Sequence, residues 1–226
     1  MATLSPQAYE RSAFIAVARG LLLCGVLVAL IAGFVSCDAC SRATPTSPRG
    51  RSEACLSRAI FGDPAESLYV LPYPVGETYE LLQSYCTVPP RSHSNSVAYD
   101  FTMPMGAEVV AARGGDVSRV VDHFPDNGEE GTGMNHIRVR HSDGSEGLYY
   151  HLRRLSAEVR VGDRVTTGGL LARAGSSGTW TPCSTCAVLH FQVSEVGEAV
   201  NFRNTDGPLD DRGGLVEGEL YTALPF

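Results

Sequence analysis

From residue 68 onward the sequence breaks into short apolar or alternating runs, most of them bounded by Gly, Pro, Asn or Asp. Short runs of this kind are typical of β-strands, and a series of them is typical of an antiparallel β domain. Between them, no window keeps a helical period of apolar residues. We therefore expect an all-β domain, built on an antiparallel sheet with long loops. The expected strands lie near residues 68–72, 78–85, 97–101, 108–112, 117–121, 136–141, 147–152, 170–172 and 187–193.

An apolar segment near the N-terminus stands apart from this domain. Residues 20–36 are uncharged and follow Arg11 and Arg19, which is the order of an export signal. As a helix they would span about 26 Å, short for a bilayer core of about 30 Å. Cys37 follows the small residue Ser36, as in a bacterial lipoprotein signal whose Cys is lipidated. An uncleaved signal anchor is the alternative, and both place the remainder outside the cytoplasm, on the bacterial cell envelope.

Composition divides the chain into four parts. Residues 1–37 are the signal or membrane anchor. Residues 38–66 are rich in Ser, Arg, Pro, Thr and Ala and are expected to be a flexible linker, because they bury too little apolar surface to offset ordering. Residues 67–198 are the β domain, and residues 199–226 are an acidic, weakly structured tail with no assigned function.

The charge balance bears on possible partners. The formal net charge is −7, and the 18 basic residues, all Arg, are scattered. Phosphate binding needs clustered positive charge, so nucleic acid is not an expected partner. The sequence also has no Walker-type phosphate loop, no dinucleotide fingerprint and no Gly-x-Ser-x-Gly elbow.

Export changes what the cysteines imply, because thiols tend to pair outside the cytoplasm. Cys183 and Cys186 could form a zinc half-site, a redox pair or a local disulfide. A site of four thiolates needs a second such pair, so we favour a disulfide that stiffens the loop. A bridge from Cys55 to Cys86 is the second candidate.

Three histidines, His93, His151 and His190, lie on or beside expected strands with other polar groups. Catalytic zinc needs protein ligands such as two His and one carboxylate, and an open position for the water that is activated. His93, Asp100 and His190 could supply that set. The residue types alone leave a structural role open, since a lone strand His more often serves as a hydrogen-bond donor.

The order of the motifs adds a resemblance to a known family. The motifs lie at residues 71–79, 93–106, 109–115, 135, 141–144, 149–152, 161–165 and 189–191. In order and approximate spacing they resemble the lysostaphin-type, or LytM-like, zinc metallopeptidase domain of cell-wall endopeptidases. The resemblance implies a Zn²⁺ ion bound by His93, Asp100 and His190. It also implies that His151 is one of two histidines that handle protons and steady the oxyanion during peptide hydrolysis.

Two positions depart from the family's pattern. Six residues separate His93 from Asp100 where the family commonly has three, so a loop must bring His93 back to the metal. The family's His-x-His is replaced by Val188-Leu189-His190, so Val188 stands where the second catalytic His is expected. Alternation along a strand puts residues 188 and 190 on one face. An apolar side chain there cannot transfer a proton, which typically costs about a hundredfold to ten-thousandfold in rate.

These features support two functions. The first is an exported, membrane-tethered zinc metalloendopeptidase that cuts peptide cross-links of bacterial peptidoglycan, slowed by Val188. The alternative is an inactive LytM-like module that binds zinc and peptidoglycan and regulates other wall hydrolases. A thiol oxidoreductase built on Cys183 and Cys186 is a weaker hypothesis, because no thioredoxin-like βαβ pattern surrounds the pair.

The remaining candidates would complete the site. Asn135 could bind a substrate backbone or hold a loop, and Trp180 could line a peptide groove or be an exposed loop aromatic. His123 or His136 could replace the missing imidazole from a neighbouring loop. His141 is expected to be a structural residue at a strand end or turn.

Overall fold

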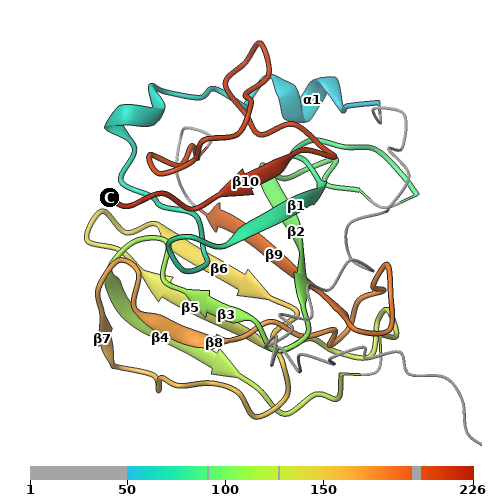
Figure 1. The fold of residues 1–226 in the computed structure, drawn as a ribbon, viewed down its shortest axis with the longest axis vertical. Helices are drawn as coiled ribbons and strands as arrows, with labels where there is room; N and C mark the ends of the chain where they lie inside the picture. The colour runs from blue at the N-terminus through green and yellow to red at the C-terminus, as the bar shows by residue number, and fades with distance from the viewer. Residues whose placement is uncertain (1–49, 91, 127, 195–199) are drawn as a thin grey trace, which may run out of the picture. The chain divides into compact units, whose positions relative to one another are not determined.

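The computed structural model describes residues 50–90, 92–126, 128–194 and 200–226. Most of its elements are strands, and the expected all-β antiparallel fold is confirmed (Figure 1). One sheet has eight strands in the order β10-β1-β2-β9-β6-β5-β4-β7, and β3 pairs with β8 in a second sheet. The elements are α1 (Glu53–Leu56), the 3-10 helix η1 (Pro64–Glu66), β1 (Thr78–Gln83), β2 (Ala98–Pro104), β3 (Glu108–Val110), β4 (Gly115–Val121), β5 (His136–Arg140), β6 (Glu146–Tyr150), β7 (Arg164–Val165), β8 (Leu170–Arg173), β9 (Cys186–Ser194) and β10 (Leu220–Thr222).

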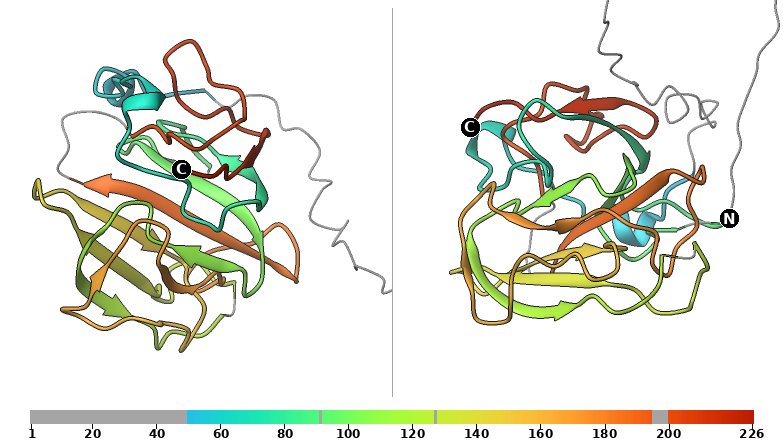
Figure 2. Two further views of the ribbon diagram at one scale, coloured as in Figure 1. Left: turned by 60° about the vertical axis from the view of Figure 1, so that its left-hand side comes forward. Right: turned by 60° about the horizontal axis from the view of Figure 1, so that its bottom comes forward.

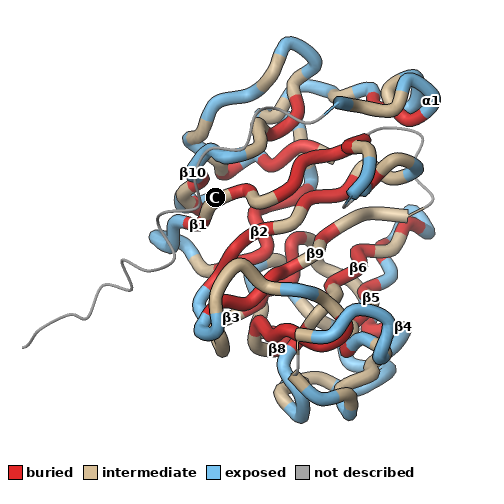
Figure 3. The backbone as a smooth tube through the Cα atoms, turned by 90° about the vertical axis from the view of Figure 1, so that its right-hand side faces the viewer, coloured by how far each residue is buried: buried red, intermediate tan, exposed pale blue. Residues whose placement is uncertain are grey.

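Alternation along the central strands separates a core face from a polar face. Tyr99 and Phe101 of β2 and Phe191 of β9 are buried and belong to the main hydrophobic cluster. Phe191 lies opposite Tyr99 on one side and Tyr149 of β6 on the other, so aromatic rings run in a row across three strands. Each such side chain contributes about 1.5–3 kcal/mol when fully buried. Figure 3 shows that the buried stretches follow the central strands.

The intervening residues of the same strands share the other face of the sheet. In β2 these include Asp100 and Thr102, and in β9 Val188 and His190. Asp100 lies directly opposite His190, and Thr102 directly opposite Val188. The register that buries the aromatic core therefore also places a carboxylate beside an imidazole.

The C-terminal residues correct the expectation of a weakly structured tail. β10 pairs with β1, with Thr78 opposite Thr222 and Tyr79 opposite Tyr221 (Figure 2). Tyr221 is fully buried, and Phe202 and Leu215 are each 1% exposed. The three side chains are widely spaced among charged and Gly residues, so no strand pattern marks them, but all three belong to the main hydrophobic cluster, where Phe202 packs against Tyr99 and Phe191.

The expected flexible linker also needs correction where the structure describes it. Cys55 is buried and bonded to Cys86 with an S–S distance of 2.05 Å, and Arg51 forms a β-bridge with Thr87. The disulfide fixes this segment to the domain, although the segment itself has few apolar side chains to bury. Residues 1–49, including the apolar segment and Cys37, lie outside the described residues. Among the described residues, no helix is long and apolar enough to cross a bilayer.

Candidate metal centre

His93, Asp100 and His190 come together on the polar face of the sheet. His190 Nδ1 lies 2.7 Å from Asp100 Oδ1, and His93 Nε2 lies 3.3 Å from Asp100 Oδ2. One ligand atom from each of the three residues lies within 4.8 Å of the others, and the two imidazole rings meet edge to face with centroids 4.9 Å apart. The structure thus assembles the three ligands expected from the sequence.

The outer nitrogens of the two imidazoles bind oxygen acceptors. His93 Nδ1 lies 3.0 Å from the backbone oxygen of Ser84, and His190 Nε2 lies 3.2 Å from Gln192 Oε1. Each of these nitrogens therefore carries a hydrogen and donates it. The remaining nitrogens, His93 Nε2 and His190 Nδ1, face Asp100 and are the two that could bind a metal ion. Ser84 O and Gln192 Oε1 are placed as outer-sphere partners are in metal sites, where they orient the ligating histidines. The donor set of two nitrogens and a carboxylate fits a zinc ion.

Electrostatics within the cluster also suit a cation. Burial by itself would raise the pKa of Asp100, but the imidazoles of His93 and His190 outweigh it and hold that pKa well below its usual value. Burial opposes charge on His93 as well, and Asp100 nevertheless raises the pKa of that imidazole. Asp100 is therefore an anion between two nitrogen donors, a site that favours positive charge.

A compact turn accommodates the long spacing between His93 and Asp100. Ser96 N donates to His93 O at 2.9 Å, Cys86 N donates to Ser96 O at 3.2 Å, and His93 N donates to Thr87 Oγ1 at 3.3 Å. Cys86, at the base of the turn, has a positive φ of 57° and is held by the disulfide to Cys55. These contacts return His93 to the sheet face, as the spacing required.

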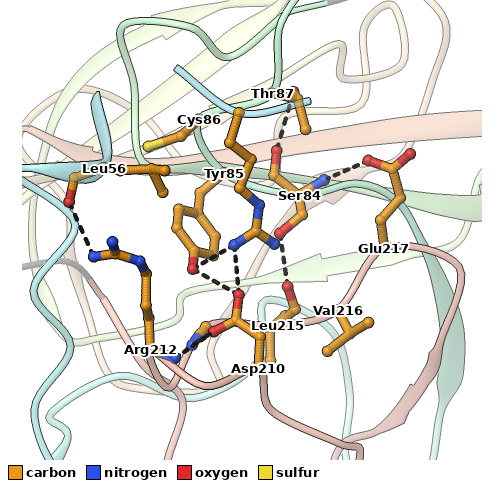
Figure 4. A network of polar contacts seen from close by, with 12 residues as sticks. Leu56, Ser84, Tyr85, Cys86, Thr87, Asp210, Arg212, Leu215, Val216 and Glu217 are labelled. Atoms are coloured by element: carbon orange, nitrogen blue, oxygen red, sulfur yellow. Dashed lines mark hydrogen bonds and ion pairs between the residues drawn. The ribbon is translucent and has the colours of Figure 1, made fainter. Parts of the chain in front are cut away.

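The C-terminal segment supports the strand end that holds His93. Ser84 donates its hydroxyl to Leu215 O at 2.6 Å, and Ser84 N donates to Glu217 Oε2 at 3.4 Å (Figure 4). The neighbouring Tyr85 donates its hydroxyl to Asp210 Oδ2 at 2.6 Å. Sequence reasoning missed this support, because it depends on residues more than a hundred positions apart.

His151 lies beside the three ligands. Its ring centroid is 6.1 Å from that of His190, and its positive φ of 64° interrupts the alternation at the end of β6. Such strained backbone is concentrated at functional sites. His151 Nδ1 donates to Ser177 O at 2.9 Å, which leaves the Nε2 lone pair available. Burial, helped by His190, lowers the pKa of His151 to about 4, so the imidazole is neutral near pH 7 and able to accept a proton.

Val188 occupies the face on which the missing imidazole was expected. It is 2% exposed and lies opposite Thr102, whose hydroxyl oxygen is buried with no hydrogen-bond partner within the described part of the chain. Neither proposed substitute reaches this position by a contact that the structure shows. His136 begins β5 and contacts the ring of Tyr150, and His123 is exposed and stacks against Phe124.

Asn135 and Trp180 have different surroundings. Asn135 is fully buried, and its amide accepts from Phe124 N and donates to Phe124 O and Leu152 O. Through these bonds the side chain holds a loop in place. Of the two roles expected for Asn135, the structure therefore shows the structural one. Trp180 is 40% exposed, in the loop that Cys183 and Cys186 close with an S–S distance of 2.06 Å. The pair is thus bridged, and the surrounding described residues form no βαβ unit that a thiol oxidoreductase of the thioredoxin type would need.

Part of the sequence matches a known family. Residues 94–202 match the model of peptidase family M23, a match that begins directly after His93 and includes Asp100, His151 and His190. This stretch, referred to from here on as the M23 domain, is therefore similar to peptidase family M23. The similarity indicates a metallopeptidase hydrolase. No curated protein sequence matches the chain significantly.

Solved structures are similar to the M23 domain at low identity. A putative M23 peptidase from Pseudomonas aeruginosa is 24% identical over 64% of this chain and 52% of its own, with a TM-score of 0.41. A zinc-containing peptidase from Vibrio cholerae is 24% identical over 62% and 41%, with a TM-score of 0.40. The catalytic domain of lysostaphin from Staphylococcus simulans is 25% identical over 54% and 84%, with a TM-score of 0.37. The chain thus spans about half of the Pseudomonas protein and less of the Vibrio protein.

Gln192 contacts His190, a candidate metal ligand, and the sequence marks it only by its place two residues after His190. Replacing Gln192 by Leu removes the acceptor for Nε2, so we expect zinc affinity to fall about tenfold to a hundredfold, as for other outer-sphere partners. Gln192→Glu keeps an acceptor and should stay close to the wild type. Competition with a chromogenic chelator measures both. Equal affinity of the Leu variant and the wild type would show that Gln192 does not position His190.

Proposed function

We propose that the chain is a zinc metalloendopeptidase that hydrolyses peptide cross-links of peptidoglycan. The observation that carries the proposal is the His93, Asp100 and His190 cluster, with inward-facing donor atoms, inside an M23 domain. These three side chains would hold Zn²⁺. When bound, the ion supplies Lewis-acid chemistry, polarising a carbonyl and lowering the pKa of water.

His151 and Val188 set the rate in this proposal. His151 is neutral and partly buried beside His190, and it takes up a proton during attack on the peptide. Val188 provides no second proton-transfer group. The enzyme is therefore slow for its fold, by a factor of about a hundred to ten thousand.

We further propose that this activity lies outside the cytoplasm, in the bacterial cell envelope, with residues 1–37 as a lipidated or helical membrane anchor. The two disulfides of the domain support export, because such bonds persist in oxidising compartments. In that compartment, peptidoglycan peptides are the proposed substrates.

The test is release of peptide fragments from purified peptidoglycan by the full chain in detergent. We expect slow release that a chelator stops and added zinc restores, followed by chromatography of the soluble products. A reaction that continues unchanged in chelator would contradict the metallopeptidase. Buffer without protein and the His190→Ala variant provide the background.

A second function is favoured by one specific feature, the apolar Val188 beside the unpartnered hydroxyl of Thr102. It is a module that keeps zinc and peptidoglycan binding, has lost turnover and regulates other wall hydrolases. Sedimentation with peptidoglycan, together with no released peptide after long incubation, would favour it. Any turnover that depends on His190 would exclude it.

A further inference from the structure

Two cationic side chains and a histidine form a strip on the polar face of the sheet, beside the metal centre. Arg119 of β4 lies directly opposite Arg138 of β5, and His136 begins β5 two residues earlier. Like charges directly opposite each other on neighbouring strands destabilise a sheet. The chain as a whole has a net charge of −7, so this pair of like charges is a local positive patch. A bound anion would offset the repulsion between the two guanidinium groups.

The strip has an unused hydrogen-bond donor. Arg138 Nε is buried and has no partner among the described residues. His136 Nδ1 donates to Met134 O at 3.0 Å. Within the same part of the chain, Arg119 forms no ion pair with a carboxylate. Burial, together with the charges of Arg119 and Arg138, lowers the pKa of His136, in keeping with a locally positive environment.

One carboxylate approaches the strip, and it is largely engaged elsewhere. Glu146 Oε1 accepts from Arg140 at 3.0 Å and from the Ser118 hydroxyl at 2.9 Å. Its other oxygen is 3.9 Å from Arg138 Nη1, at the outer limit of an ion pair. Two guanidinium groups, those of Arg138 and Arg140, thus share one carboxylate, and the charge of Arg119 adds to the positive charge that remains for a ligand.

The strip lies in line with the metal centre. His136 is opposite Tyr150, and Tyr150 is opposite His190, with ring centroids 5.3 Å and 5.5 Å apart. β5 and β9 are separated by β6 alone, so His136 lies two strand spacings, or about 10 Å, from His190. Arg138 lies two residues further along β5, and Arg119 lies on β4, three strand spacings from β9, so their backbones are about 12 to 16 Å from His190. An extended peptide covers that distance with about four or five residues.

We propose that Arg119 and Arg138 form a subsite for a carboxylate group of the peptide substrate, about four or five residues from the bond that is cut. The planar fork of a guanidinium group matches a carboxylate and forms charge-assisted hydrogen bonds with it. The inference rests on the proposed function, because it assigns the peptide that the metal centre would cleave. It makes the enzyme selective for anionic stem peptides over neutral ones.

The test uses the zinc-loaded full chain and one cell-wall stem peptide in two forms, with free carboxylates and with the same carboxylates amidated. Calorimetry should show that the wild type binds the free form at least about tenfold more tightly, the order expected for hydrogen bonds to a charged group. The double variant Arg119→Gln, Arg138→Gln should lose that preference. Arg164→Gln is the matched control, because Arg164 is exposed and pairs with Asp116 on β4 at 3.2 Å.

The outcomes separate this subsite from the proposed function. Equal binding of the two peptide forms by the wild type, or a preference that survives the double substitution, overturns the subsite even if the peptide is hydrolysed. A preference that the double variant loses supports the subsite even if no hydrolysis occurs, and in that case the proposed activity alone fails. Thermal unfolding of each variant shows that the comparison is made between folded proteins.

Discussion

Replacing Asp100 by Asn is expected to lower zinc affinity by at least about a hundredfold, more than the loss of a typical outer-sphere partner. Asp100 is the carboxylate that lies between the imidazoles of His93 and His190, at 3.3 Å and 2.7 Å. Asn keeps the size of the side chain and removes its charge, so both nitrogens would lose the anion that complements the cation. Metal content after dialysis, measured by atomic absorption, gives the result directly.

A second readout of the same change is stability. Zinc in a thousandfold excess over its dissociation constant raises the free energy of unfolding by about 4 kcal/mol if it binds only the folded chain. The wild type should show this rise in a thermal scan, and Asp100→Asn at the same zinc concentration should show no more than about a third of it. Asp143→Asn is the control, because Asp143 pairs with Arg113 at 2.6 Å and is not among the three ligands. Full zinc loading of Asp100→Asn would show that the cluster is not the metal site.

The strand pattern predicted the fold and most of the candidate site because both depend on alternation. Once Tyr99 and Phe191 are assigned to the core, Asp100 and His190 must point to the other face. The family resemblance then supplied the role of His93, whose loop no pattern could place. The turn that returns it depends on the Cys55 to Cys86 disulfide and on Thr87, contacts between distant or irregular segments.

The C-terminal segment could not be predicted for a similar physical reason. Tyr221 pairs with Tyr79 from the far end of the chain, and β10 is only three residues long. A strand so short has no measurable period, and its partner cannot be chosen from local sequence. Gln192 and Ser84 were missed because a polar side chain or a backbone oxygen that orients a ligand is ordinary in sequence and distinct only in contact.

Replacing Val188 by His is expected to raise turnover of peptidoglycan peptides by at least about a hundredfold, the low end of the contribution of a general acid or base. Position 188 shares the face of His190, and the unpartnered hydroxyl of Thr102 opposite it can bind and orient the new ring. Zinc content should not change, since residue 188 is not among the three ligands. Single-turnover assays on a defined cross-linked peptide separate the chemical step from binding.

The matched control for this gain is Val188→Phe, which adds a ring of similar bulk that cannot transfer a proton. Val188 is 2% exposed, so either ring overpacks the site at a cost of about 1–3 kcal/mol, and thermal scans should show comparable losses of stability for both. Adding Thr102→Val to Val188→His should remove part of the gain, because the imidazole loses the group that orients it. If Val188→His is no faster than Val188→Phe while both remain folded and zinc-loaded, the rate is not limited by a proton-transfer group at position 188. A gain confined to the His variant would instead mean that the site retains the metal and the geometry for hydrolysis, and that one side chain sets its rate.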